Sequence, residues 1–125
     1  MANLVRTDTN YLWTAFGPTN VQIHHVTIAN SLGDAQIALD LVPRIDARGL
    51  PPERRVRHAL EVASAYHARN LIDAAVRELL VAERLASEQV HAHVMSRELV
   101  LRLHATAAGR RDRRLAALAR RMKLI

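Results

Sequence analysis

Apolar residues recur at every third or fourth position along most of this chain, with polar residues between them. This spacing is typical of amphipathic α-helices, and no stretch shows the strict alternation of apolar and polar residues expected of a half-buried strand. The pattern therefore predicts an all-α fold of six helices joined by short turns. The expected helices span about Thr19–Leu32, Ala35–Ile45, Pro52–Asn70, Leu71–Ala86, Ser87–Gly109 and Asp112–Lys123.

Glycine and proline mark several of the predicted helix ends. Gly33 is a natural left-handed cap for the first helix, and Asp34 is placed to act as the N-cap of the second. Pro43 should bend or shorten the second helix near its end, because proline lacks the N–H that a helix interior needs. Gly109 is expected to end the fifth helix.

The breaks also repeat along the chain. Gly33 is followed five residues later by Ala38, and Asn70 is followed five residues later by Ala75. Tetratricopeptide repeats (TPRs) have a small turn residue and an alanine at these places, because neighbouring helices cross closely there. We therefore expect a TPR-like helical hairpin array of about three antiparallel helix pairs over residues 17–125, with a generic helical bundle as the alternative. Residues 1–16 are expected to be irregular or the end of a preceding helix.

Composition narrows the kind of core and the class of protein. Only four residues are aromatic, namely Tyr11, Trp13, Phe16 and Tyr66, so the core has to be built from aliphatic side chains, which suits closely packed helices. The absence of cysteine excludes disulfides, thiolate zinc sites and cysteine nucleophiles, and it suits a reducing cytoplasm. No apolar run approaches the roughly 20 residues of a membrane span. We expect a cytoplasmic protein that makes no membrane contact.

Positive charge gathers at the C-terminal end. The formal net charge is +6, and the residues from Arg97 onward include nine arginines or lysines against only Glu98 and Asp112. Such a patch attracts nucleic-acid phosphates through counterion release. It lacks the interleaved aromatic residues, and the Asn or Gln, with which proteins read bases. An accessory nucleic-acid contact through this helix is therefore an alternative to a solvated end helix.

The histidines and the possible catalytic residues give little support to metal or enzyme chemistry. No two of the seven histidines stand three or four residues apart, the spacing that places two metal ligands on one helical face. Glu61, Ser64 and His67 stack at single turns along one helix rather than converge on a substrate atom. The chain also lacks a glycine-rich phosphate loop. We expect no enzyme activity, no metal and no cofactor.

Several longer strings resemble one protein family. They are YLWTAFGPTNVQIHHV (11–26), LGD (32–34), LPPERRVRHALEVASAY (50–66), LLVAERLASEQV (79–90), SREL (96–99) and LAALARR (115–121). In this order they resemble the C-terminal TPR-like region of XRE-type helix-turn-helix transcriptional regulators of GC-rich filamentous bacteria, over nearly the whole chain. The resemblance implies helical repeats that sense a peptide, a protein or a small molecule.

The sequence departs from this family in two respects. It contains no segment with the spacing of a phage-repressor-like helix-turn-helix, so DNA binding is expected only through an N-terminal domain absent from this sequence. The family's usual LLD after Arg-His is here ALE, with Glu61 in place of the aspartate. What the resemblance implies is thus a non-enzymatic interaction or sensor domain of a transcriptional regulator.

The phasing of the repeat brings one set of polar side chains to the concave face of the array. Asparagine pairs well with a peptide backbone, and arginine with a carboxylate, so this face is expected to bind a protein, a peptide or a small molecule with an acidic end. Alternatively, the same residues line a shallow solvated groove or a dimer contact. The predicted groove residues are Asn20, Thr27, Asn30, Arg57, Ser64, His67 and Arg97.

Trp13 and Phe16 are candidates for a contact with a neighbouring molecule. They precede the first helix, where they would add aromatic surface to its aliphatic side chains, and exposed apolar patches favour association, most often as a two-fold dimer. We therefore predict a homodimer formed through residues 11–32. A structural homo-oligomerisation module is the alternative to the sensor function.

Overall fold

The computed structural model describes residues 17–125, and every regular element in that range is helical. The α-helices are α3 (Pro18–Ser31), α4 (Ala35–Leu41), α5 (Pro52–Ala68), α6 (Ile72–Leu85), α7 (Ser87–Ala92), α8 (Val94–Ala105), α9 (Ala107–Arg111) and α10 (Arg113–Arg121), and η1 (Val42–Arg44) is a short 3-10 helix. The all-α prediction is confirmed for this range. None of these helices is both long and apolar enough to cross a membrane.

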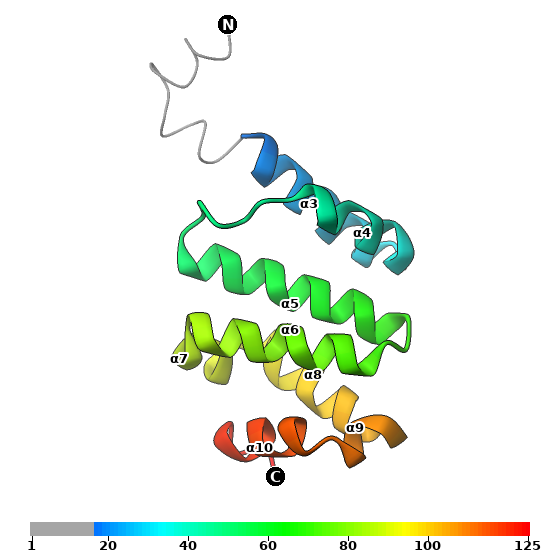
Figure 1. The fold of residues 1–125 in the computed structure, drawn as a ribbon, viewed down its shortest axis with the longest axis vertical. Coiled ribbons are helices and arrows are strands. Elements are labelled where there is room, and N and C mark those ends of the chain that lie inside the picture. The colour runs from blue at the N-terminus through cyan, green and yellow to red at the C-terminus, as the bar shows by residue number, and fades with distance from the viewer. Residues whose placement is uncertain (1–16) are drawn as a thin grey trace, which may run out of the picture.

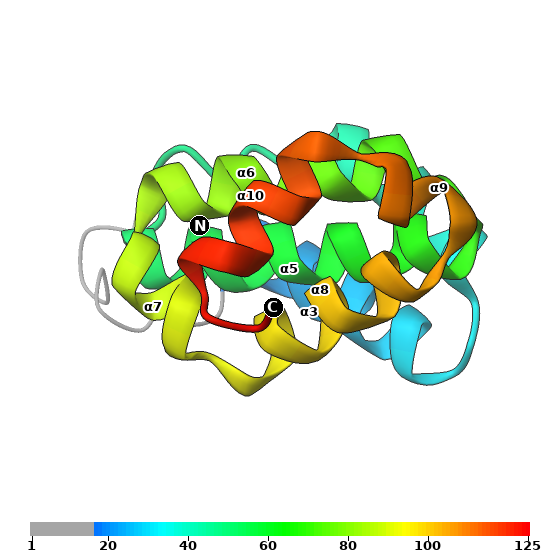
Figure 2. The ribbon, with the colours of Figure 1, turned by 90° about the horizontal axis from the view of Figure 1, so that it is seen from below.

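The helices are stacked in chain order along the long axis of the molecule (Figure 1). α3 and α4 lie at one end, the antiparallel pair α5 and α6 lies in the middle, and α8 leads to α9 and α10 at the other end. Seen from that end, α10 lies over α6 and α8 (Figure 2). Each layer is therefore in contact mainly with the layers that precede and follow it in the sequence.

Three helices end in the same left-handed turn. Gly33, Asn70 and Lys123 have positive φ angles of 80°, 59° and 57°, and the N–H of the residue that follows each one donates to the carbonyl five residues earlier, at 2.8 Å in all three cases. This is the Schellman pattern, which satisfies carbonyls that the helix end leaves unpaired. The predicted left-handed cap at Gly33 is confirmed, and Asn70, which stands 37 residues later, has the same left-handed backbone conformation.

The predicted second helix is shortened as expected at Pro43. α4 ends at Leu41, and Val42–Arg44 continues as the 3-10 helix η1. Asp34 occupies the N-cap position of α4, but its side chain makes no capping hydrogen bond. That part of the N-cap prediction is wrong, and the first turn of α4 begins without a side-chain cap.

The predicted single helix from Ser87 to Gly109 is wrong, because the structure breaks it into α7, α8 and α9. At the first break, Nδ1 of His93 accepts a hydrogen bond from the N–H of Met95 at 3.0 Å. At the second, Oγ1 of Thr106 accepts from the N–H of Gly109 at 2.9 Å. Each side chain accepts a backbone N–H that would otherwise bond within a continuous helix, and it thereby ends the preceding helix and caps the N-terminus of the next one.

Gly109 does not end a helix but lies buried inside α9. A Cβ at this position would lie 1.8 Å from the carbonyl oxygen of Leu103. The glycine is therefore needed for close approach of α9 to the end of α8, and the expectation that it acts as a helix stop was wrong for this reason.

Two hydrophobic clusters hold the stack together. The main cluster joins α5, α6, α7, α8 and α10, and it includes Ala75 and Ala82, both fully buried. Small residues allow two helices to pack closely. The second cluster, which we call the first-hairpin cluster, joins α3 and α4 to Ala65 of α5. Its buried members are Val26, Ala29, Ala35, Ala38 and Ala65.

Candidate functional site

A cavity with a volume of about 440 Å³ lies between α3 and α5. This volume falls within the range of roughly 300–1,000 Å³ that is usual for small-molecule sites. Three of the predicted groove residues line it, namely Asn20, Thr27 and Arg57. Its other lining residues are Val21, Ile23, His24, His25 and Arg54. We call this site the α3–α5 cavity.

α5 contributes to the cavity through its N-terminal half, and α3 contributes residues from Asn20 to Thr27. On α5, Arg54 and Arg57 stand three residues apart, and this spacing places them on one face of the helix. Nη1 of Arg54 donates to Oδ1 of Asn20 at 3.0 Å, so the arginine is fixed across the gap to α3. Val21 and Ile23 add apolar surface on the α3 side of the cavity.

The charge of the α3–α5 cavity is positive. Arg54 and Arg57 contribute two guanidinium groups, and His24 and His25 add two imidazoles. Arg57 has one acidic neighbour, Glu61, with 3.6 Å between Nε and Oε1, and its side chain stays 55% exposed. A loose, half-exposed pair of this kind leaves the guanidinium able to bind a second carboxylate.

Asn30 does not belong to the open cavity. Its Nδ2 donates to the backbone carbonyl and to Oε2 of Glu61, both at 2.9 Å. Glu61 is buried, with 6% of its surface exposed, and a buried carboxylate needs such donors. Asn30 therefore fastens α3 to α5 through its Nδ2, and its role as a ligand contact stays a prediction.

Ser64 and His67 lie further along α5 and are not among the residues that line the α3–α5 cavity. Burial lowers the pKa of His67, and the positive charge of Arg102 on α8 lowers it further. His67 is therefore close enough to Arg102 for the two charges to interact. Of the predicted groove residues, Asn20, Thr27 and Arg57 line this cavity, while Ser64 and His67 do not.

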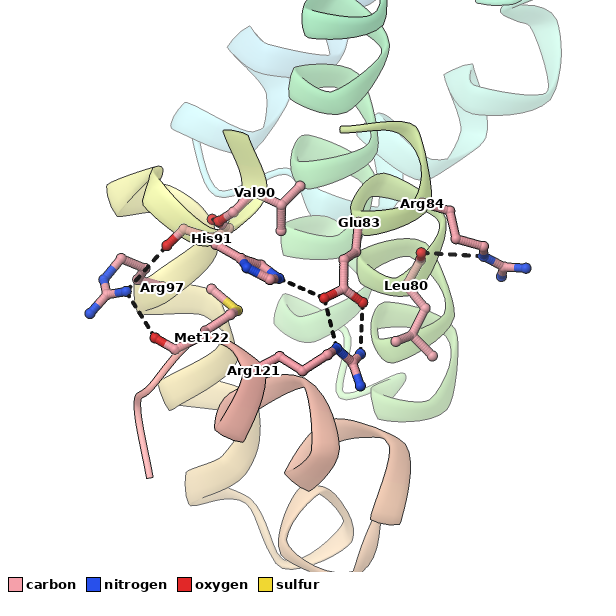
Figure 3. Close-up of polar contacts among 9 residues, drawn as sticks. Leu80, Glu83, Arg84, Val90, His91, Arg97, Arg121 and Met122 are labelled. Atoms are coloured by element: carbon pink, nitrogen blue, oxygen red, sulfur yellow. Dashed lines mark hydrogen bonds and ion pairs between the residues drawn. The ribbon is translucent and has the colours of Figure 1, made fainter. Parts of the chain in front are cut away.

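Arg97 is used in packing. Its Nη1 donates to the backbone carbonyls of His91 and Met122, both at 3.2 Å (Figure 3). These contacts tie α8 to α7 and to the end of α10. Arg97 is not among the residues that line the α3–α5 cavity, and the expectation that it shares a groove with Arg57 stays a prediction.

A polar cluster near Arg97 joins α6, α7 and α10. Glu83 pairs with His91 at 2.6 Å and with Arg121 at 2.7 Å (Figure 3). The hydrogen bond from Arg121 is the main cause that holds the pKa of Glu83 below its ordinary value, and the contact with His91 acts in the same direction. This cluster clamps the last helix onto the stack.

The basic C-terminal end is only partly available to a partner. Arg121 is paired with Glu83, and Arg114 is paired with Asp73 and Asp112. The remaining cations of this end are exposed, namely Arg110, Arg111, Arg113, Arg120 and Lys123. Arg97 donates to two backbone carbonyls and Arg102 pairs with Glu98, so an accessory contact with phosphates has five candidate side chains rather than nine.

Residues 17–125 hold no group of three or more His, Asp or Glu side chains that is able to bind a metal ion. Trp13 and Phe16 lie outside the described residues. The residues that sequence reasoning missed are His24, His25 and Arg54, and the available signal was the three-residue spacing of Arg54 and Arg57.

Comparisons with protein-family models, with curated proteins and with solved structures found no match for this chain.

Proposed function

We propose that this chain is a non-enzymatic ligand-binding domain that recognises a carboxylate-bearing peptide, protein or small molecule in the α3–α5 cavity. The observation that carries the proposal is the composition of that cavity. Two arginines and two histidines line it beside apolar surface from Val21 and Ile23. Arginine binds a carboxylate through two parallel hydrogen bonds, while an apolar wall accommodates the rest of the ligand.

The arrangement of the helices supports a TPR-like array as the scaffold of this domain. The two left-handed caps at Gly33 and Asn70 stand 37 residues apart, and Ala75 and Ala82 are fully buried where α6 packs on α5. On this proposal the helix pairs are α3 with α4, α5 with α6, and α8 with the broken partner α9 and α10. The resemblance to XRE-type regulators suggests that the array acts as a sensor in the cytoplasm, and that DNA is bound by a domain outside this sequence.

The experiment is a titration of the isotope-labelled chain with a pool of short acetylated peptides that have free carboxyl ends, followed by NMR. The same pool with amidated ends serves as the control. We expect the free-acid pool to shift the signals of His24, His25 and Arg57, and we expect Arg57→Gln to weaken these shifts roughly tenfold or more. Arg110→Gln, which changes an exposed arginine of α9, should have no effect. Equal shifts with the amidated pool would refute carboxylate recognition.

Self-association is a second candidate function, and one observation favours it. Val21, Ile28 and Leu32 are spaced by seven and four residues, so they form one stripe along α3, and they are 44%, 44% and 72% exposed. An exposed apolar stripe of this kind suits a second copy of the same helix. We expect light scattering to show a dimer at micromolar concentration, and Ile28→Glu to abolish it, whereas Val94→Glu at an exposed valine of α8 should not. A monomeric mass at high concentration would contradict this candidate.

A further inference from the structure

A second cavity, of about 210 Å³, lies between α5, α6 and the segment that follows α4. Aliphatic side chains from all three segments line it, among them Ile45 and Val81, and only three of its lining side chains are ionisable: Arg55, His58 and Glu78. It is separate from the α3–α5 cavity, with which it shares no lining residue. We call it the α5–α6 cavity.

Two ionisable side chains of this cavity, His58 and Glu78, have polar atoms without a hydrogen bond or ion pair among residues 17–125. Nδ1 of His58 is buried without a hydrogen-bond partner, and the residue is only 8% exposed. Among residues 17–125, Glu78 makes no hydrogen bond or ion pair. Buried polar groups are nearly always satisfied in native proteins, so the unpartnered Nδ1 of His58 in a mostly aliphatic cavity points to a bound molecule that supplies the contact, and the half-buried carboxylate of Glu78 is available to the same molecule.

Burial has shifted the titration of both groups toward their neutral forms. Burial raises the pKa of Glu78, and the charge of Arg77 offsets this in part. Burial lowers the pKa of His58, against an opposing effect of Glu61. A neutral imidazole accepts a hydrogen bond, and a desolvated carboxylate is strongly stabilised by a cation. Both groups are therefore suited to bind an ammonium group.

The helices place the two charged side chains at opposite ends of the cavity. α5 ends at Ala68 and the antiparallel α6 begins at Ile72, so Val62 on α5 lies opposite Glu78 on α6. Arg55 lies seven residues before Val62, toward the N-terminus of α5. Arg55 and Val62 are seven residues apart, which is about 10 Å of helix at a rise of 1.5 Å per residue. A guanidinium group and a carboxyl group are thus separated along an apolar trough, and a ligand that fits them carries opposite charges at its two ends.

We propose that the α5–α6 cavity binds a short aliphatic zwitterion, with its carboxylate on Arg55, its ammonium on Glu78 and His58, and its methylene chain against the aliphatic walls. The size of the cavity agrees, because about 210 Å³ lies below the range of roughly 300–1,000 Å³ for drug-sized ligands. A small linear ω-amino acid satisfies the charge pattern, the length and the volume together.

The test is an NMR titration of the isotope-labelled full chain with ε-aminocaproate, compared with caproate and hexylamine as probes that each lack one charged end. We expect ε-aminocaproate to shift the methyl signals of Ile45 and Val81 and to bind at least about tenfold more tightly than either single-charge probe. Glu78→Gln should weaken this binding roughly tenfold or more, and Glu88→Gln, which changes an exposed carboxylate on α7, should leave it unchanged. Arg55→Gln tests the carboxylate end of the ligand and should likewise weaken binding, whereas its control Arg110→Gln should leave binding unchanged.

Three outcomes would overturn the proposal. One is the absence of shifts at Ile45 and Val81 at high millimolar ε-aminocaproate. Another is equal binding of caproate or hexylamine, since that would make the cavity a plain apolar groove. The third is unchanged affinity in Glu78→Gln, whose fold is expected to survive because the substitution removes only a desolvated charge. None of these outcomes bears on the α3–α5 cavity, so the proposed function is tested separately.

Discussion

Asn30→Ala should destabilise the fold through the carboxylate that it leaves behind. Asn30 donates to Oε2 of Glu61 at 2.9 Å, and the other oxygen of that carboxylate has only the 3.6 Å contact with Arg57. Because the Glu61 side chain is 8% exposed, water cannot replace the lost donor at low cost. A hydrogen bond to a charged group contributes about 1.5–3 kcal/mol, and we expect the free energy of unfolding to fall by that amount.

Urea unfolding of wild type and Asn30→Ala measures this difference, with Gln36→Ala as the control. Gln36 donates to Asp40 at 2.9 Å on the exposed surface of α4, so its loss should cost only a few tenths of a kcal/mol, as is usual for exposed helical pairs at about 0.2–0.5 kcal/mol. In the Glu61→Gln background, Asn30→Ala should cost less, because a neutral amide requires the donor less than a carboxylate does. The reasoning is refuted if Asn30→Ala costs the same in both backgrounds, or no more than Gln36→Ala.

Three further predictions concern packing and pH. Ala75→Leu should cost about 1–3 kcal/mol by overpacking a fully buried crossing, whereas Ala105→Leu, at an exposed alanine, should be nearly neutral, and equal melting temperatures would contradict the phasing. Gly109→Ala should lower the melting temperature strongly, since its Cβ would lie 1.8 Å from a backbone oxygen, while Gly49→Ala meets no atom within 4 Å and serves as its control. The pKa of Glu83 is lowered by Arg121 and His91 from an ordinary value of 4.5, so its stabilisation is complete above that pH and is lost as the pH falls through the folded-state pKa. Glu83→Gln should therefore flatten the acid side of the stability–pH curve, and an unchanged slope below pH 4.5 would disprove this.

The helices and most of their ends could be predicted because their signals are local. Gly33 and Pro43 determine backbone conformation through their own covalent structure, so their effects hold in any surroundings. The breaks at His93 and Thr106 could not be predicted in this way. Each depends on a side chain that captures a backbone N–H two or three residues ahead, and the apolar period continues through both positions.

The candidate site was predicted only in part, for a reason that lies in tertiary packing. Repeat phase groups Asn20, Thr27 and Arg57, and all three line the α3–α5 cavity. It could not show that Asn30 and Arg97 use their donors within the fold, because that depends on the partners across each helix contact. The α5–α6 cavity was not anticipated either, since it exists only where the segment after α4 passes beside two other helices.

The small size of the first-hairpin cluster implies that α3 and α4 are less stable than the rest of the fold, and this links ligand binding in the α3–α5 cavity to local stability. Four of the five buried residues of this cluster are alanines, and alanine contributes much less burial free energy than the leucines of the main cluster. Native-state hydrogen exchange should therefore find α3 and α4 opening as one cooperative unit while α5, α6 and α8 remain protected. A molecule bound between α3 and α5 would have to close that unit, so its binding would slow exchange throughout the hairpin, including amides that it never touches.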